Sequence, residues 1–159
     1  MTNRVFDERI EQAVLTIDSE IFFSTGIHLS DYEKSILSEG ILFAKTQTPN
    51  NYAVVMDSME TLTKLESEYN YIIYSLSRQL EEANFEFRTH YDNLFATLSR
   101  AGRTLAAAES EALSKDGNKL LNLKNKINRL ENVINYLKSE VLILRSKLKT
   151  FDAKRSNTF

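Results

Sequence analysis

The sequence contains no cysteine, one proline and four glycines in 159 residues. Without cysteine the chain can form neither a disulfide nor a cysteine-ligated zinc site, as expected for a protein of a reducing cytoplasm. A β-sandwich or barrel has many tight turns, which are usually formed by proline and glycine, and this sequence has too few of both. These absences favour an all-α, elongated protein built from long helices.

Long apolar runs and catalytic motifs are also missing. No stretch reaches the roughly 18 consecutive apolar residues of a membrane span, and the N-terminus turns acidic at Asp7 without a signal-peptide core. The two histidines, His28 and His90, are far apart and lack metal-ligand spacing. No glycine-rich phosphate loop is present, and no serine or threonine has a partnered histidine. We therefore expect a soluble, cytoplasmic, non-enzymatic protein with no membrane partner, cofactor, catalytic residue or metal site.

The most informative feature is an unbroken heptad ladder over residues 120–151. Two series of apolar residues, each repeating every seven positions, fill the a and d positions of five successive heptads. A helix with this repeat presents one narrow apolar seam that must be buried against another helix. We predict a C-terminal heptad coiled coil through which the chain forms a homo-oligomer. The oligomerisation residues are Leu120, Leu123, Ile127, Leu130, Ile134, Leu137, Val141, Leu144, Leu148 and Phe151.

The ladder does not fix what lies against its seam. β-Branched residues at a positions and leucine at d positions favour a parallel two-stranded coil. Apolar residues outside the seam, Val133, Leu142 and Ile143, favour a higher oligomer or another helix packed alongside. An intramolecular antiparallel hairpin of residues 52–99 and 104–152 is the open alternative.

An acidic helical arm over residues 1–48 precedes the long helices. Apolar residues recur at helical spacing in its first half, and the segment ending in Gly26 closes this first helix. Ser30 and Glu33 have the spacing of a capping box, which predicts the start of a second helix. Gly40 weakens the middle of that second helix.

Long helices are expected after Pro49, the only proline of the chain. Residues 52–99 should form one helix, on the order of 70 Å long at 1.5 Å per residue. Residues 103–152 should form another, which carries the coiled-coil segment. The tail, residues 153–159, is expected to fray.

Charge is distributed unevenly along the chain. Residues 1–70 carry a net charge of −7 and residues 71–159 a net charge of +5, although the whole chain carries only −2. Aromatic residues interleave with arginines near the end of the long helix, and single-stranded nucleic acid is bound by such a combination of cations and aromatic platforms. Alternatively, the cations solubilise the helices and the aromatics belong to the core. The candidate nucleic-acid-binding residues are Arg88, Arg100, Arg103, Lys115, Lys119, Lys124, Lys126 and Arg129.

One stretch of the sequence is similar to a known family. Residues 108–120 (Ala-Glu-Ser-Glu-Ala-Leu-Ser-Lys-Asp-Gly-Asn-Lys-Leu), then 126–127 (Lys-Ile) and 135–141 (Asn-Tyr-Leu-Lys-Ser-Glu-Val), resemble the C-terminal half of phage UvsY-type recombination mediators. The resemblance covers about residues 52–155, but the family's Tyr-Tyr-x-Gly turn is replaced by Ser-Arg-Ala-Gly at 99–102.

The resemblance implies a particular activity. It implies an oligomer in the host cytoplasm that binds single-stranded DNA, loosens the single-strand-binding protein and helps to load a RecA-like recombinase. It places Arg88, Arg100 and Arg103 nearest the family's basic motif. A protein of another class fits the same helices: a coiled-coil adaptor, structural or inhibitory protein that acts through protein–protein contacts, with residues 1–48 as its docking element.

Overall fold

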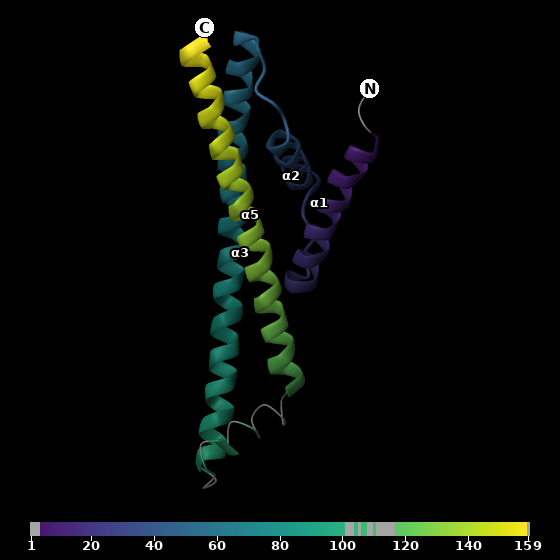
Figure 1. Cartoon of the computed structure of the whole chain (residues 1–159). Coiled ribbons are helices and arrows are strands. Elements are labelled where there is room, and N and C mark those ends of the chain that lie inside the picture. Colours follow the sequence, from purple (N-terminus) through teal and green to yellow (C-terminus); the bar gives the residue numbers. More distant parts are fainter. Residues whose placement is uncertain (1–3, 101–103, 105, 108–109, 111–116, 159) are drawn as a thin grey trace.

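The computed structural model describes residues 4–100, 104, 106–107, 110 and 117–158 (Figure 1). Within them the chain forms the helices α1 (Arg4–Thr25), α2 (Asp31–Ala44), α3 (Tyr52–Arg100) and α5 (Gly117–Thr158), and no strand. The predicted all-α architecture, with two long helices, is confirmed. None of the helices in this described part combines the length and apolar character needed to cross a membrane.

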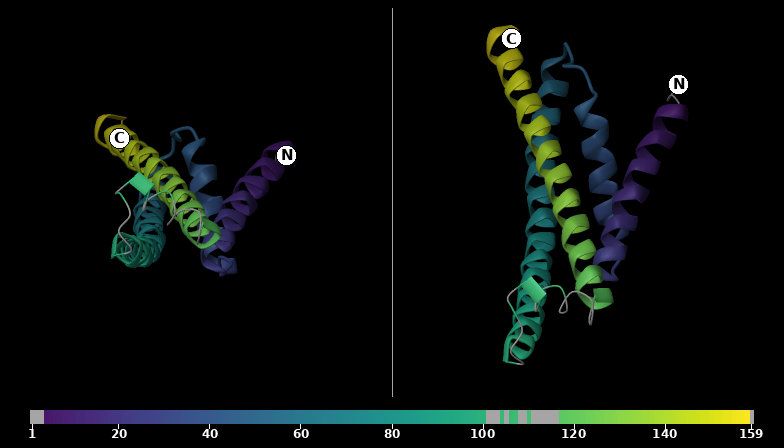
Figure 2. Two further views of the ribbon diagram at one scale, coloured as in Figure 1. Left: turned by 90° about the horizontal axis from the view of Figure 1, so that it is seen from below. Right: turned by 60° about the horizontal axis from the view of Figure 1, so that its bottom comes forward.

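α3 and α5 form an antiparallel hairpin, and the two short helices pack on one side of it (Figures 1 and 2). α1 packs against α5 and α2, whereas α2 also contacts α3. Of the predicted 103–152 helix, the part from Gly117 onward lies in α5, and most of the preceding segment lies outside the described residues. The tail expected to fray continues α5 as far as Thr158, where Arg155 Nη2 donates to Asp152 Oδ1 over 2.7 Å.

The ends of the short helices follow the sequence signals. The Ser30 hydroxyl accepts a hydrogen bond from the Glu33 N–H, and the Glu33 side chain accepts one from the Ser30 N–H, so the capping box is confirmed. Gly26 adopts φ +73°, a left-handed conformation that costs glycine little, and its N–H donates to Phe22 O. The Asn51 side chain accepts from the Val54 N–H at the start of α3.

The heptad ladder is buried inside a single chain. Nine of its ten residues are buried and the tenth, Leu148, is partly buried, with α3 as the main neighbour of α5. The structure therefore has the intramolecular hairpin, and the parallel arrangement expected for this seam is wrong because α3 offers an apolar face within the same chain. Self-association stays a prediction, but these residues could serve it only if the hairpin opened.

One continuous core joins the four helices. At its centre the Tyr69 ring is fully buried, its hydroxyl donates to Leu37 O over 3.0 Å, and burial raises the pKa of this phenol. The Tyr69 ring lies against the backbone of Gly40, which was expected only to weaken α2. A Cβ added at Gly40 would lie 2.5 Å from Cε1 and Cζ of this ring. The glycine is thus a packing requirement of the core.

The loop between α1 and α2 is held by a buried carboxylate. Asp18 accepts hydrogen bonds from the Leu29 N–H (2.6 Å) and from His28 (2.8 Å), and Lys34 Nζ lies 3.8 Å away. Burial by itself would raise the pKa of Asp18, but these hydrogen bonds and charges outweigh it and hold the pKa below its ordinary value. His28 also stacks on Phe22, so this histidine has a structural role.

Replacing Asp18 by alanine should lower the free energy of unfolding by about 1.5–3 kcal/mol at neutral pH, because the charged hydrogen bond to a buried backbone amide is removed. A lowered folded pKa stabilises the fold above the ordinary pKa of about 4, and this stabilisation disappears as pH falls through the folded pKa. Urea unfolding of both proteins should therefore show a difference that shrinks below about pH 4. Alanine at the exposed Asp57 is the control, and a difference that stayed constant with pH would contradict this role of Asp18.

Candidate nucleic-acid interface

Two of the predicted lysines meet at a pocket near the end of α1. Lys119 and Lys126 line it together with Asn122 of the same helix, facing Phe23 at the end of α1. The pocket has a volume of about 840 Å³ and is also lined by Glu86 of α3. Residues from three helices therefore bring amine, amide and aromatic groups to one place.

The electrostatics of this pocket are mixed. The ammonium groups favour an anion, whereas the Glu86 carboxylate opposes one. The amino end of α5 and the carboxyl end of α1 meet here, so the contributions of the two helix dipoles offset each other. Ser24, which also lines the pocket, is buried, and its hydroxyl has no hydrogen-bond partner among the described residues. The pocket can therefore bind an anionic group only by means of its two lysines and its neutral hydrogen-bonding groups.

Arg129 is already engaged within the chain. Its guanidinium lies 3.6 Å from the centre of the Phe23 ring, and its Nη1 lies 3.4 Å from Glu20 Oε2. A cation–π contact and a partly exposed ion pair together fix α5 against the end of α1. Arg129 therefore holds the wall of the pocket and has less charge to offer a ligand than Lys119 or Lys126.

Of the other predicted cations whose side chains the structure describes, Lys124 and Arg88 do not line the pocket. Lys124 follows Lys119 by five residues, which turns it about 140° around the helix axis, and both are exposed. Arg88 is exposed on α3, two residues after the Glu86 that lines the pocket. Three candidates cannot be placed: Arg103 and Lys115 lie outside the described residues, and so does the side chain of Arg100.

The aromatic residues near the end of α3 stack on one another. The ring centres of Phe87 and Tyr91 are 6.1 Å apart and those of Tyr91 and Phe95 are 6.3 Å apart, with nearly parallel planes. All three residues are half-buried, whereas Phe85 on another face of α3 is 71% exposed. The three stacked rings are therefore not fully open platforms for bases.

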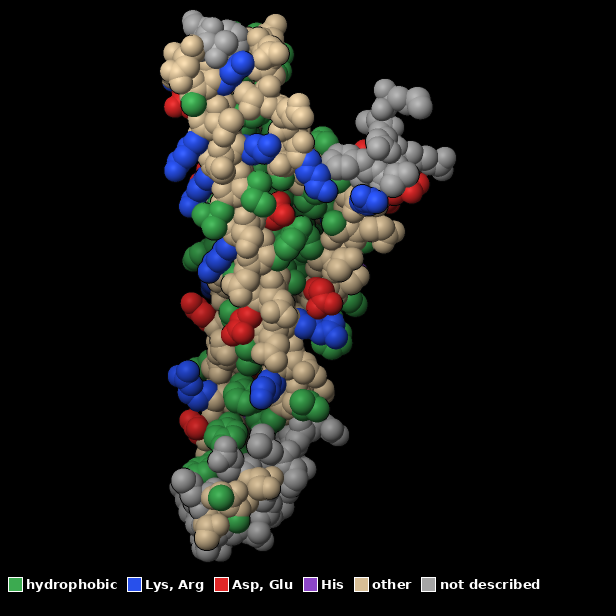
Figure 3. Space-filling model, in the orientation of Figure 1, with side chains coloured by type: hydrophobic (Ala, Val, Ile, Leu, Met, Phe, Trp, Pro, Cys, Tyr) green, Lys and Arg blue, Asp and Glu red, His purple; other side chains and the backbone are tan. Residues whose placement is uncertain are grey.

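Charged side chains of both signs lie on one face of the molecule. On the face shown in Figure 3, lysine and arginine side chains predominate in the upper part, whereas aspartate and glutamate side chains lie among them in the lower part. The acidic α1 lies against the more basic α5, so folding brings helices of opposite net charge side by side.

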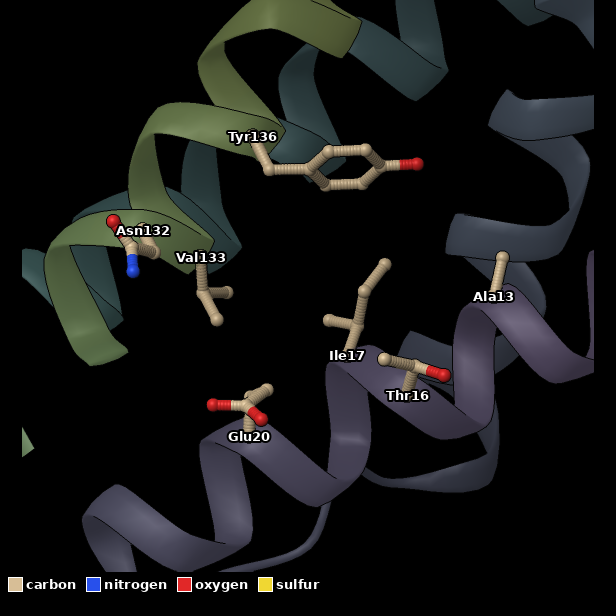
Figure 4. Close-up of a pocket in the computed structure, with 7 residues that line it drawn as sticks. All are labelled: Ala13, Thr16, Ile17, Glu20, Asn132, Val133 and Tyr136. Carbon is tan, nitrogen blue, oxygen red and sulfur yellow. The ribbon is translucent and has the colours of Figure 1, made fainter.

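A second hollow lies between α1 and α5. Figure 4 shows Ala13, Thr16 and Ile17 on the α1 side facing Val133 and Tyr136 of α5. The volume of this groove is about 480 Å³, and Glu20 and Asn132 also line it.

Past Tyr136 a smaller pocket of about 280 Å³ lies between the same helices and α2. Glu140 lines it, and its Oε2 is buried without a hydrogen-bond partner among the described residues. Burial raises the pKa of Glu140, although Tyr136 and Lys45 counteract that rise. The two hollows share Ala13 and Tyr136, so they form one largely apolar path beside α1.

Sequence reasoning missed the partners of the lysines. Phe23, Ser24 and Glu86 reach the pocket only through packing between distant parts of the chain, and no local spacing marks them. The one available signal was the apolar pair Phe22-Phe23 near the end of the first helix, which stays exposed in the fold, with Phe23 beside the lysines.

Comparison of the chain with protein-family models, with curated proteins and with solved structures gave no match. Among the described residues, no group of histidine, aspartate and glutamate side chains is arranged to hold a metal ion.

Proposed function

We propose that this protein is a non-enzymatic recombination mediator of the UvsY type that binds single-stranded DNA in an oligomeric form. The observation that carries the proposal is the convergence of Lys119, Asn122 and Lys126 on one pocket beside Phe23. Single-stranded nucleic acid is bound by cations that contact phosphates and by aromatic groups that contact bases. The sequence resemblance supports a RecA-like recombinase and a single-strand-binding protein as the protein partners.

Several copies are central to this proposal. A single chain with a net charge of −2 and a carboxylate in its lysine pocket attracts a polyanion weakly. An oligomer repeats the pocket along the bound strand, so that weak contacts add up through high effective concentration. Weak individual sites also suit a mediator, which must release DNA to the recombinase.

Reversing two charges in the pocket, Lys119→Glu with Lys126→Glu, should weaken binding to an oligothymidine strand by about tenfold or more at low salt. The slope of log affinity against log salt concentration should fall by about 0.7 for each phosphate that the variant no longer neutralises. Fluorescence anisotropy over a salt series measures both quantities. Glu86→Gln should have the opposite effect on affinity, because it removes the opposing charge.

The matched control is Lys138→Glu with Lys149→Glu, two exposed lysines of α5 that do not line the pocket. This control changes the net charge by the same amount. If affinity decreased equally in both double variants, binding would depend on overall charge and not on the pocket. A wild-type protein that binds no oligothymidine even at low salt would refute the proposed activity.

The groove beside α1 favours one other function, that of an adaptor that binds a partner protein. Its apolar walls, formed by residues such as Ile17 and Val133, suit a helical peptide. Deleting residues 1–48 would not test this function, because Val14 and Leu37 belong to the common core and their removal would unfold the chain. If the wild-type protein bound no DNA, the groove would make the adaptor the better-supported function.

A further inference from the structure

We infer that two copies of the chain associate antiparallel through the outer face of α3, about an axis near Arg78. This inference deepens the proposed function, which rests on several copies, by naming the surface that joins them. The surface, here called the outer stripe, consists of residues on one side of α3. They are Lys64, Tyr71, Tyr74, Arg78, Glu82, Phe85 and Asp92, all exposed.

The outer stripe lies opposite the core. The buried residues of α3, such as Leu65, Ile72 and Leu76, mark the inward face. Tyr71 and Phe85 point away from that face and are 69% and 71% exposed, while Tyr74 is 62% exposed. Three large aromatic side chains thus lie in solvent on the side of α3 that faces away from its buried residues. Aromatic residues and arginine are the types enriched at the centres of protein–protein interfaces.

Five members of the outer stripe repeat every seven residues. The series Lys64, Tyr71, Arg78, Phe85 and Asp92 keeps the spacing of a helix seam over about 42 Å. Hydrophobic periodicity does not reveal this series, because it mixes charged with aromatic residues. In an antiparallel pair centred on Arg78, Lys64 would lie opposite position 92 of the second copy, and Tyr71 would lie opposite position 85.

These pairings are complementary. Lys64 faces Asp92 of the other copy, and Tyr71 faces Phe85, in both cases twice by symmetry. Arg78 lies at the axis opposite its own counterpart, where Glu82 of each chain is within reach of the other chain's guanidinium. A parallel pair would align each charged member with its own copy, so the charge order selects the antiparallel arrangement.

The same order of charges argues against nucleic acid as the occupant. Lys64 lies in one half of the outer stripe, the carboxylates Glu82 and Asp92 lie in the other half, and Arg78 lies between them at the axis. Glu60, one turn before the first lysine, would face Ala96 of the second copy and adds no repulsion. A polyanion would be repelled by half of this surface, whereas a second copy is attracted to both halves.

The test is the mass of the full chain in solution, measured without DNA by analytical ultracentrifugation over a concentration series. Wild type should show reversible association. Asp92→Lys should raise the dissociation constant about tenfold, because two attractive pairs become repulsive. Exchanging both charges, Lys64→Asp with Asp92→Lys, should restore association to near the wild-type level. Tyr71→Ala with Phe85→Ala should abolish it without changing the circular dichroism spectrum, since both residues are exposed.

Leu142→Ala is the control, because this residue is 63% exposed on α5 and outside the outer stripe. A wild type that stays monomeric at all concentrations, an exchange that fails to restore association, or association insensitive to removal of both aromatics would each overturn the inference. DNA is absent from the experiment, so failure here is distinguishable from failure of the lysine pocket to bind oligothymidine.

Discussion

Replacing Leu137 by alanine should lower the free energy of unfolding by about 2–5 kcal/mol, the range for truncating a fully buried leucine. Leu137 has no exposed surface and belongs to the core shared by α3 and α5 of one chain. Because the helix it packs against lies in the same chain, the decrease in stability should be independent of protein concentration. Urea unfolding of wild type and variant at two concentrations, a hundredfold apart, measures the difference.

Leu142→Ala serves again as the matched control, since it truncates the same residue type on the same helix in an exposed position. Its effect should stay within about 0.5 kcal/mol. The Leu137 variant should also keep the wild-type mass in solution. If truncating Leu137 abolished association, or if the stability difference grew with protein concentration, the prediction would be contradicted. The heptad seam would then be an assembly surface between chains.

Replacing Gly40 by alanine should destabilise the protein although alanine is the better helix former. Helix propensity alone would favour alanine by about 1 kcal/mol. The added Cβ would, however, lie 2.5 Å from ring carbons of Tyr69, which is fully buried and hydrogen-bonded to α2. Overpacking of a core typically costs about 1–3 kcal/mol, and a ring held on all sides has little room to move. We expect the clash to dominate and the melting temperature to fall.

Glu39→Ala, at the exposed neighbouring position of α2, should be nearly neutral and controls for changes in helix propensity. Combining Gly40→Ala with Tyr69→Leu should cost less than the sum of the two single changes, because the smaller side chain leaves space for the Cβ. An increase in melting temperature for Gly40→Ala alone would show that the tyrosine ring gives way easily.

Much of the fold could be predicted because its signals are local. The pair Ser30 and Glu33 specified a helix start through two reciprocal hydrogen bonds, and Pro49 separated the short helices from the long ones. The seven-residue repeat identified which face of α5 is buried. None of these conclusions required knowledge of any distant part of the chain.

The partner of the buried face could not be predicted from the repeat. Periodicity says that leucines such as Leu137 must be covered, but a second chain and α3 cover them equally well. The off-seam residues illustrate the same limit, since Val133 is buried whereas Leu142, equally apolar, is 63% exposed. Whether Val133 or Leu142 is covered by α1 depends on how the short helices pack against the hairpin.

The candidate site was predictable in its lysines and not in its surroundings. Lys119 and Lys126 share one face of α5 because seven residues make nearly two turns. Glu86 and Glu20 oppose or neutralise the neighbouring cations, and both come from other helices. Counting charges along the sequence therefore overstated the basic character of this region.

The continuous core does not extend along the whole hairpin. Among the described residues its buried members end at Leu76 in α3 and begin at Leu130 in α5, and the buried Leu120 and Leu123 lie outside it. Segments with fewer buried neighbours open at a lower free-energy cost than the rest of a protein. The lysine pocket, which Leu123 lines, lies beyond this core, so we expect the helices around it to separate at a lower free-energy cost than those around Leu137.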